Sequence, residues 1–216
     1  MTTGLKRISQ LVKEHPDRKV QTIMHNVNKD TLREIHKRQD KNKAGGIDEI
    51  TKIEYAENLE ENLDNLMSRM KSFSYRPQAV RRTYIPKDGS DQPRPLGIPA
   101  YEDKLVQGVM AEILTAIYEP KFYEFSYGFR PDKSQHQAIE ALDKMLFGWT
   151  NWVVDADIKS FFDTVDHEWM MKFLEHDIED KNFLRYVTRF LRAGIMEAGK
   201  RYDTEAGVPQ GGLCIA

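Results

Sequence analysis

The fold of this chain is decided by one stretch, Trp-Val-Val-Asp-Ala-Asp-Ile-Lys-Ser-Phe-Phe-Asp at residues 152–163. The apolar residues around Asp155 and Asp157 favour a buried strand, since Val and Trp are common in strands. Side chains two residues apart share a strand face, so both carboxylates can point the same way. A carboxylate in apolar surroundings is costly unless it is paired or bound to a metal, and Mg²⁺ suits oxygen ligands. The stretch therefore indicates either a metal site or an acid at a strand end that caps the next turn.

Helical and extended patterns on both sides of this stretch indicate an α+β fold. Helices are expected at residues 5–12, 31–39, 53–70, 101–118, 134–147, 167–174 and 182–191, and strands at residues 79–86 and 92–99. Asp88-Gly89 between the two strands is a strong hairpin signal, and the prolines of the second strand favour an edge position. Ser134 and Asp166 are the expected N-caps of the helices that follow them.

Three segments carry apolar side chains that we expect to pack inward. The pattern at 53–70 predicts one continuous amphipathic helix whose apolar stripe is core. The helix at 134–147 has an expected inward face of Ala138, Ile139, Leu142, Met145 and Leu146. The aromatic segment 122–131 contains Arg130, and aromatic rings with an Arg can stack on bases, but core packing is favoured.

Composition excludes several classes of protein. The chain has 216 residues, of which 40% are hydrophobic and 31% charged, enough for a core beneath a very polar surface. No apolar run approaches the roughly 20 residues of a membrane span. The single cysteine, Cys214, excludes an internal disulfide and fits a reducing, cytosolic setting. No Cys/His cluster has zinc spacing.

The charges are unevenly distributed, although the net charge is only -2. Residues 71–94 contain six basic and two acidic side chains, whereas residues 155–181 contain nine acidic and three basic ones. A basic segment followed by an acidic one fits a polyanion held against a metal-binding centre. Two solvated faces of opposite sign are the simpler alternative.

Two basic segments are candidates for contact with that polyanion. The loop at 41–48 carries Lys41 and Lys43, and Gly45-Gly46 permits a positive φ or a close backbone approach, although a plain connection between helices is favoured. The hairpin carries Arg82, Lys87 and Arg94, which suit a triphosphate or a nucleic-acid backbone. An edge strand made basic against aggregation explains these cations equally well.

Six short segments, in this order, resemble the group II intron reverse transcriptases, also called maturases. They are residues 43–48, 82–87, 94–99, 126–131, 156–163 and 207–212. The resemblance covers nearly the whole chain from about Asp30. It implies a right-hand polymerase, with a polar N-terminal arm at 1–29, mostly helical fingers with a β-hairpin at 30–150, and the start of an RRM-like palm at 151–216.

The resemblance also implies the catalytic metal site. Asp157, not Asp155, would bind two Mg²⁺ ions, with the backbone carbonyl of Ile158 as a second ligand. The chain would then have to turn sharply at Phe162 to bring the ring and the metal to one nucleotide, and a turn before His167 allows this.

Further residues take roles in nucleotide and RNA binding by the same resemblance. The ring of Phe162 would select deoxynucleotides, and the backbone N–H groups of Phe161 and Phe162 would meet the triphosphate. Lys87 and Arg94 would clamp the phosphates, and Gln210 would line the nucleotide pocket. The expected RNA or template contacts are Lys41, Lys43, Arg81, Arg82 and Arg130.

The family's Tyr-Ala-Asp-Asp segment, which supplies the other metal-binding carboxylates, is absent. The chain is therefore expected to be a fragment, inactive by itself, of a parent that acts on an RNA template, a DNA primer and deoxynucleotide triphosphates. A non-catalytic splicing cofactor that binds intron RNA is the alternative. A third interpretation is an interaction domain that forms a homodimer through exposed apolar surface.

Overall fold

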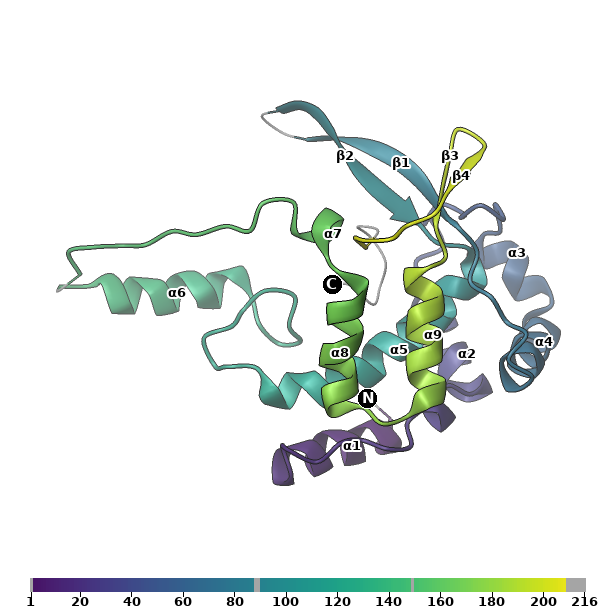
Figure 1. Ribbon diagram of the computed structural model, residues 1–216, viewed down its shortest axis with the longest axis horizontal. Coiled ribbons are helices and arrows are strands. Elements are labelled where there is room, and N and C mark those ends of the chain that lie inside the picture. Colours follow the sequence, from purple (N-terminus) through teal and green to yellow (C-terminus); the bar gives the residue numbers. More distant parts are fainter. Residues whose placement is uncertain (1, 88–89, 149, 209–216) are drawn as a thin grey trace.

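The computed structural model describes residues 2–87, 90–148 and 150–208, in which a small mixed sheet lies on one side of a group of helices (Figure 1). The helices are α1 (Thr3–Glu14), η1 (Met24–Asn26), α2 (Lys29–Arg38), α3 (Lys52–Glu57), α4 (Leu59–Lys71), α5 (Tyr101–Tyr118), η2 (Glu119–Lys121), α6 (Gln135–Leu146), α7 (Phe161–Thr164), α8 (His167–Asp177) and α9 (Lys181–Leu191). The strands are β1 (Val80–Lys87), β2 (Ser90–Ile98), β3 (Ile195–Glu197) and β4 (Lys200–Tyr202). Among the described residues, no helix is both long and apolar enough to cross a bilayer.

Helix α5 forms the centre of the core, because apolar side chains recur on nearly all of its faces and are buried. Helices α1 and α2 pack against it. Leu5, Val12 and Ile23, from the predicted N-terminal arm, are buried in this core, so the segment is not a free arm. Phe183 and Tyr186 of α9 join the same core. The described residues on both sides of the predicted fingers–palm boundary thus share one core, and the boundary itself stays a prediction.

One carboxyl group of α5 lies inside this core. Asp103 is 2% exposed and accepts hydrogen bonds from the hydroxyl of Tyr75 and from the backbone N–H of Gln78, the latter at 2.8 Å. Burial raises the pKa of Asp103 to about 7, although both hydrogen bonds favour the charged carboxylate. Desolvation therefore outweighs the two hydrogen bonds in setting this pKa.

We expect Asp103 to make the free energy of unfolding fall as the pH rises from about 4 to about 7. The folded state holds the proton more tightly than the unfolded state, whose pKa is near the ordinary 3.8, so the charged carboxylate at higher pH destabilises the fold. In chemical denaturation across this range, the slope of the free energy of unfolding against pH should be more positive in Asp103→Asn than in the wild type. The Asn side chain does not titrate, so any change that it makes to the free energy of unfolding is the same at every pH, and the slopes are compared rather than the absolute values. Equal slopes in the two proteins would contradict the raised pKa of Asp103.

The sheet has the strand order β2-β1-β3-β4. Strands β1 and β2 form the predicted antiparallel hairpin, with Arg81 opposite Ile98. Strand β1 pairs in parallel with β3, where Val80 lies opposite Ile195, and β3 and β4 are antiparallel. The predicted hairpin and the edge position of β2 are both confirmed. An edge position suits the prolines of β2, because proline has no backbone N–H to donate to a second neighbouring strand.

The single helix predicted at 53–70 is wrong. Asn58 (φ -127°, ψ 40°) separates α3 from α4, and α3 has its own capping box in which Thr51 and Glu54 satisfy each other's backbone N–H. Ile53, expected in the core, is 63% exposed, whereas Leu63 and Leu66 are buried as predicted. The apolar periodicity continues through the break, which is why the sequence pattern did not reveal it.

The inward face predicted for α6 is also wrong. The helix does begin after Ser134, which forms a capping box with Gln137, yet Ile139 and Met145 are 65% and 66% exposed. Figure 1 shows α6 standing apart from the other helices. Helical spacing identifies the apolar side of a helix, but it does not supply the element that must cover it.

Candidate nucleotide-binding site

A sharp turn at Ser160 begins the candidate site. Ser160 has a left-handed backbone (φ 52°), which directs the extended segment before it into the short helix α7. The rings of Phe161 and Phe162 lie 5.5 Å apart at 72°, with Phe161 half exposed. A sharp turn before His167 was expected at Phe162; the chain turns two residues earlier, at Ser160, and Phe162 lies within α7.

The loop that begins at Gly207, near the end of the described chain, is hydrogen-bonded to this turn. The backbone N–H of Val208 donates to the carbonyl of Phe162 at 2.7 Å, and that of Gly207 donates to the carbonyl of Val165 at 2.8 Å. His167 adds a hydrogen bond of 2.7 Å between its Nε2 and the carbonyl of Gly207. Two motifs separated by more than forty residues in sequence thus form one unit. Gln210, the predicted nucleotide contact, lies outside the described residues.

Gly207→Ala is expected to destabilise this unit by about 2–3 kcal/mol. Gly207 has φ 80°, and a Cβ there would lie 2.8 Å from the carbonyl oxygen of Asp163 and 3.1 Å from that of Phe162. Gly199→Ala is the matched control, because φ is 76° there but nothing lies within 4 Å, so only the backbone cost of about 1 kcal/mol applies. Thermal unfolding should separate the two variants; equal losses would show that the contact with α7 is unimportant.

The base of the β1–β2 hairpin completes the site. Arg82 and Gly97 line one small cavity together with Asp163 and Val208. Arg82 is one of the predicted polyanion contacts, whereas no sequence pattern indicated that His167 would bind the neighbouring loop. Val80 of β1 and Ile195 of β3 are paired and line the same cavity, so the three motifs meet where these two strands join.

The two predicted phosphate clamps lie further out along the hairpin. Arg94 is exposed and lies opposite Ile85, while the backbone of Lys87 pairs with Ser90 beside the turn. The hairpin projects away from the helices in Figure 1. Phosphate contacts by Lys87 and Arg94 stay predictions.

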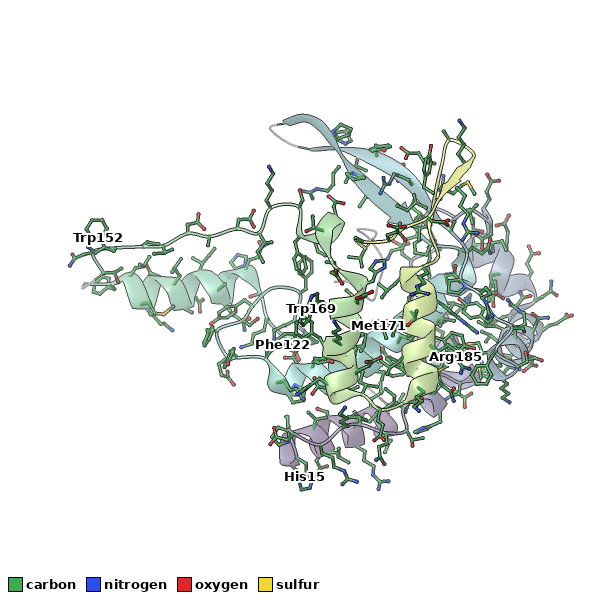
Figure 2. The ribbon with its side chains drawn as sticks, in the orientation of Figure 1. His15, Phe122, Trp152, Trp169, Met171 and Arg185 are labelled. Atoms are coloured by element: carbon green, nitrogen blue, oxygen red, sulfur yellow. The ribbon has the colours of Figure 1, made fainter. Side chains whose placement is uncertain are left out.

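The stretch that begins at Trp152 is not the buried strand that its sequence predicts. Residues 150–158 are extended but unpaired among the described residues, and Trp152 and Val154 are 90% and 93% exposed. Figure 2 shows Trp152 at the end of this segment farthest from α7. A strand needs a neighbour for its backbone hydrogen bonds, and the sheet β2-β1-β3-β4 does not include this segment. Asp155 and Asp157 are accordingly exposed rather than held on a buried face.

The predicted Mg²⁺ ligands, Asp157 and the carbonyl of Ile158, are neighbours in the exposed segment before α7. The carboxylate of Asp157 and the adjacent carbonyl of Ile158 are hard oxygen donors of the kind that Mg²⁺ prefers, so this pair fits the ion chemically. No group of three or more His, Cys, Asp or Glu side chains is placed to hold a metal within the described part of the chain. The pair supplies part of a coordination shell, and metal binding stays a prediction.

Three of the predicted RNA contacts, Lys41, Lys43 and Arg81, lie in or beside the loop at 41–48. Lys41 and Lys43 are exposed. Arg81, in contrast, donates from Nη2 to the carbonyl of Gly45 at 2.6 Å, and Lys104 donates to the carbonyl of Ala44 at 2.6 Å. The loop is therefore held down by β1 and α5, while its two lysines remain available to a ligand.

Arg130, another predicted RNA contact, is almost buried, since its side chain is only 8% exposed. Its guanidinium forms an ion pair with Glu119 at 2.7 Å and donates to the carbonyls of Tyr123 and Ser126 at 2.6 and 2.7 Å. It thereby organises the aromatic segment 122–131. The core packing expected for that segment is wrong, because Phe129 is 84% exposed.

An apolar cavity of about 660 Å³ lies beneath the α7 turn. Phe161 and Phe162 line it together with side chains of α5, α8 and α9, including Met110, Leu174 and Phe190. The two rings thus lie at the edge of an open apolar space, next to the loop that begins at Gly207.

Comparison with known proteins identifies the family to which this arrangement belongs. Residues 85–214, more than half of the chain, match the family model described as reverse transcriptase (RNA-dependent DNA polymerase). The chain belongs to the reverse transcriptase family. It is 41% identical over 154 residues to the group II intron-encoded protein LtrA of Lactococcus lactis subsp. cremoris, covering 71% of this chain and 26% of that protein. The resemblance inferred from the six motifs is thereby confirmed.

Other relatives of this reverse transcriptase chain cover more of it. The protein YkfC of Escherichia coli is 38% identical over 78% of this chain and 45% of its own length, and the putative COX1/OXI3 intron 1 protein of Saccharomyces cerevisiae is 34% identical over 98% and 26%. A chain of a partial Cas6-RT-Cas1–Cas2 complex superposes with a TM-score of 0.56 at 16% identity, over 88% of this chain and 31% of that one. This likeness confirms the fingers and palm-like fold. The chain spans between about a quarter and a half of the length of these sequence relatives.

Proposed function

We propose that this chain forms the fingers and the start of the palm of an RNA-directed DNA polymerase encoded by a group II intron. The observation that supports this most is the meeting of α7, the Gly207-Val208 loop and the base of the β1–β2 hairpin. This meeting brings α7, which carries the predicted sugar-selecting Phe162, to the base of the strand pair that carries Arg82 and Arg94. A nucleotide contacting both would have its sugar at α7 and its phosphates toward the hairpin.

In this proposal, Asp157 and the carbonyl of Ile158 hold the catalytic Mg²⁺ ions, two in the full-length enzyme. When bound, the ions would supply the charge stabilisation that in-line phosphoryl transfer requires. The chain's own residues bind and orient: Lys87 and Arg94 hold the triphosphate, and Gln210 lines the pocket. One carboxylate and one carbonyl leave most of the coordination positions of two ions unfilled, so for the 216 residues alone we propose no polymerase activity.

The proposed partners are a group II intron RNA, an RNA template, a DNA primer and deoxynucleotide triphosphates, in the cytoplasm. The relatives named as a group II intron-encoded protein and as a nuclear intron maturase, the latter from Arabidopsis thaliana, favour an added role in splicing and mobility. A non-catalytic splicing cofactor is the second candidate. It is favoured by the exposed side chains of Lys41 and Lys43, which lie on a loop that β1 and α5 hold in place.

Primer extension on an RNA template with Mg²⁺ and deoxynucleotides tests the proposal. The longest natural form of the chain should extend the primer, and the 216-residue chain should not. Tight RNA binding by the longest form without any extension would reject the polymerase and favour the splicing cofactor. Extension by the 216 residues alone would show that the fragment carries a complete metal site.

A further inference from the structure

A second concave surface lies away from the candidate nucleotide site, with a volume of about 550 Å³. Five of its eight lining residues are arginines, contributed by the link from α4 to β1, by α9 and its C-terminus, and by β4. These arginines, which we call the arginine groove, are Arg76, Arg185, Arg189, Arg192 and Arg201. None of them is among the residues that the family motifs point to.

Helix α9 separates this groove from the apolar cavity beneath α7. Val187 and Phe190 line the apolar cavity, whereas Arg185 and Arg189 line the arginine groove. Figure 2 shows Arg185 on the side of α9 that faces away from α8. The arginines at 185, 189 and 192 recur at helical spacing, so they form a stripe along one face of the helix and its end.

The structure organises three of these arginines around one turn. Arg189 donates to the carbonyls of Tyr75 and Phe73 at 2.8 and 3.0 Å, and Arg76 donates to the carbonyl of Phe73 at 2.7 Å. The guanidinium of Arg185 lies 4.4 Å from the centre of the Phe73 ring. Backbone carbonyls and an aromatic face orient these guanidinium groups without neutralising them.

The positive charge of the groove is poorly compensated. Residues 182–202 contain five basic residues and one acidic residue, Glu197, which accepts a hydrogen bond from Tyr84. Within the described residues, the one ion pair made by a groove arginine joins Arg201 to Asp203 at 3.6 Å, and the Asp203 side chain is 86% exposed. Burial and the neighbouring Arg76 lower the pKa of Arg189. Like charges so close together destabilise the free protein and favour an anionic ligand.

We infer that the arginine groove binds the phosphate backbone of a base-paired RNA segment, at a site separate from the nucleotide pocket. Arginine binds phosphate oxygens in a bidentate manner, which an ammonium group cannot do. The arginines from 185 to 192 span roughly 10 Å along the helix axis. One strand of a duplex presents about three phosphates over that length. The choice of RNA as the ligand rests on the proposed function.

The test measures binding of an RNA duplex to the full chain across a range of salt concentrations. The variant is Arg185→Gln/Arg192→Gln, because these two side chains donate no hydrogen bond that holds the fold among the described residues. We expect the Gln variant to bind the RNA duplex roughly 10-fold more weakly. The slope of log affinity against log salt concentration should fall in magnitude by about two, because two fewer phosphates are neutralised. Arg7→Gln/Arg18→Gln removes the same charge from exposed positions in and after α1 and should have a smaller effect. Arg185→Lys/Arg192→Lys should retain most of the salt dependence but lose affinity.

The outcomes separate this inference from the proposed polymerase. Equal salt dependence in the Gln variant and the wild type would overturn the groove, even if primer extension by the longest form succeeds. Failure of primer extension, with the groove effect present, would reject the polymerase alone. Tighter binding of polyglutamate than of RNA, lost in the Gln variant, would overturn RNA as the ligand and indicate an acidic protein partner. Thermal unfolding of each variant establishes that it is folded.

Discussion

Asp157→Asn is expected to reduce primer extension by the longest form of this protein at least about 1,000-fold, equivalent to about 4 kcal/mol of transition-state stabilisation. The proposed role of Asp157 is to hold the catalytic ions, and an amide of the same size cannot supply the negative charge that binds them. The residue is exposed in an extended segment, so the substitution should leave the unfolding temperature unchanged. Extension assays over a range of Mg²⁺ concentrations, with thermal unfolding alongside, provide the measurement.

Asp155→Asn is the matched control for this experiment. It removes the same charge two residues earlier, from the same exposed segment, and is expected to retain most of the activity. Because alternate residues of an extended chain share a face, position alone does not distinguish the two acids. A larger loss in Asp155→Asn than in Asp157→Asn would show that the metal role is assigned to the wrong carboxylate.

Gly46→Ala is expected to lower the free energy of unfolding by about 3 kcal/mol, and the melting temperature by roughly 10 °C. A Cβ on Gly46 would lie 2.4 Å from the carbonyl oxygen of Pro99 and 2.5 Å from the backbone nitrogen of Ala100. These are backbone atoms at the start of α5, so the clash cannot be relieved by a side-chain rotation. The loop that carries Lys41 and Lys43 would have to move away from the core helix.

Gly128→Ala is the control for Gly46→Ala. Nothing lies within 4 Å of a Cβ at Gly128, so the added methyl group should change the melting temperature little. Binding of RNA by Gly46→Ala, measured below its melting temperature, would test whether the position of the loop matters for Lys41 and Lys43. A melting temperature like that of the wild type would mean that this loop is not held against α5 in solution.

In the loop at 41–48, the local sequence indicated that the backbone makes a close contact but not what it contacts. Gly45-Gly46 indicated either a positive φ or a close backbone approach. The close approach is what the structure shows, but the neighbour is the start of α5 rather than a nucleic acid. Arg81 and Arg130 were likewise predicted to contact RNA, yet both donate hydrogen bonds to backbone carbonyls of the protein. Charge type is visible in a sequence, whereas the partner that a charge finds is not.

The sequence by itself determined the elements that depend on near neighbours in the chain. These include α5, the β1–β2 hairpin and the caps at Ser134 and Asp166, because periodicity, turn residues and capping act over a few positions. The order of six motifs also determined the family, which the match to reverse transcriptases confirmed. The tertiary structure alone decided which surfaces are covered, and it left residues 152–158 and the apolar side of α6 exposed. It also decided which distant residues meet: Val208 binds Phe162, and the arginines of α9 lie with Arg76 and Arg201. Burial and contact require a partner distant in the chain, and local spacing carries no information about that partner.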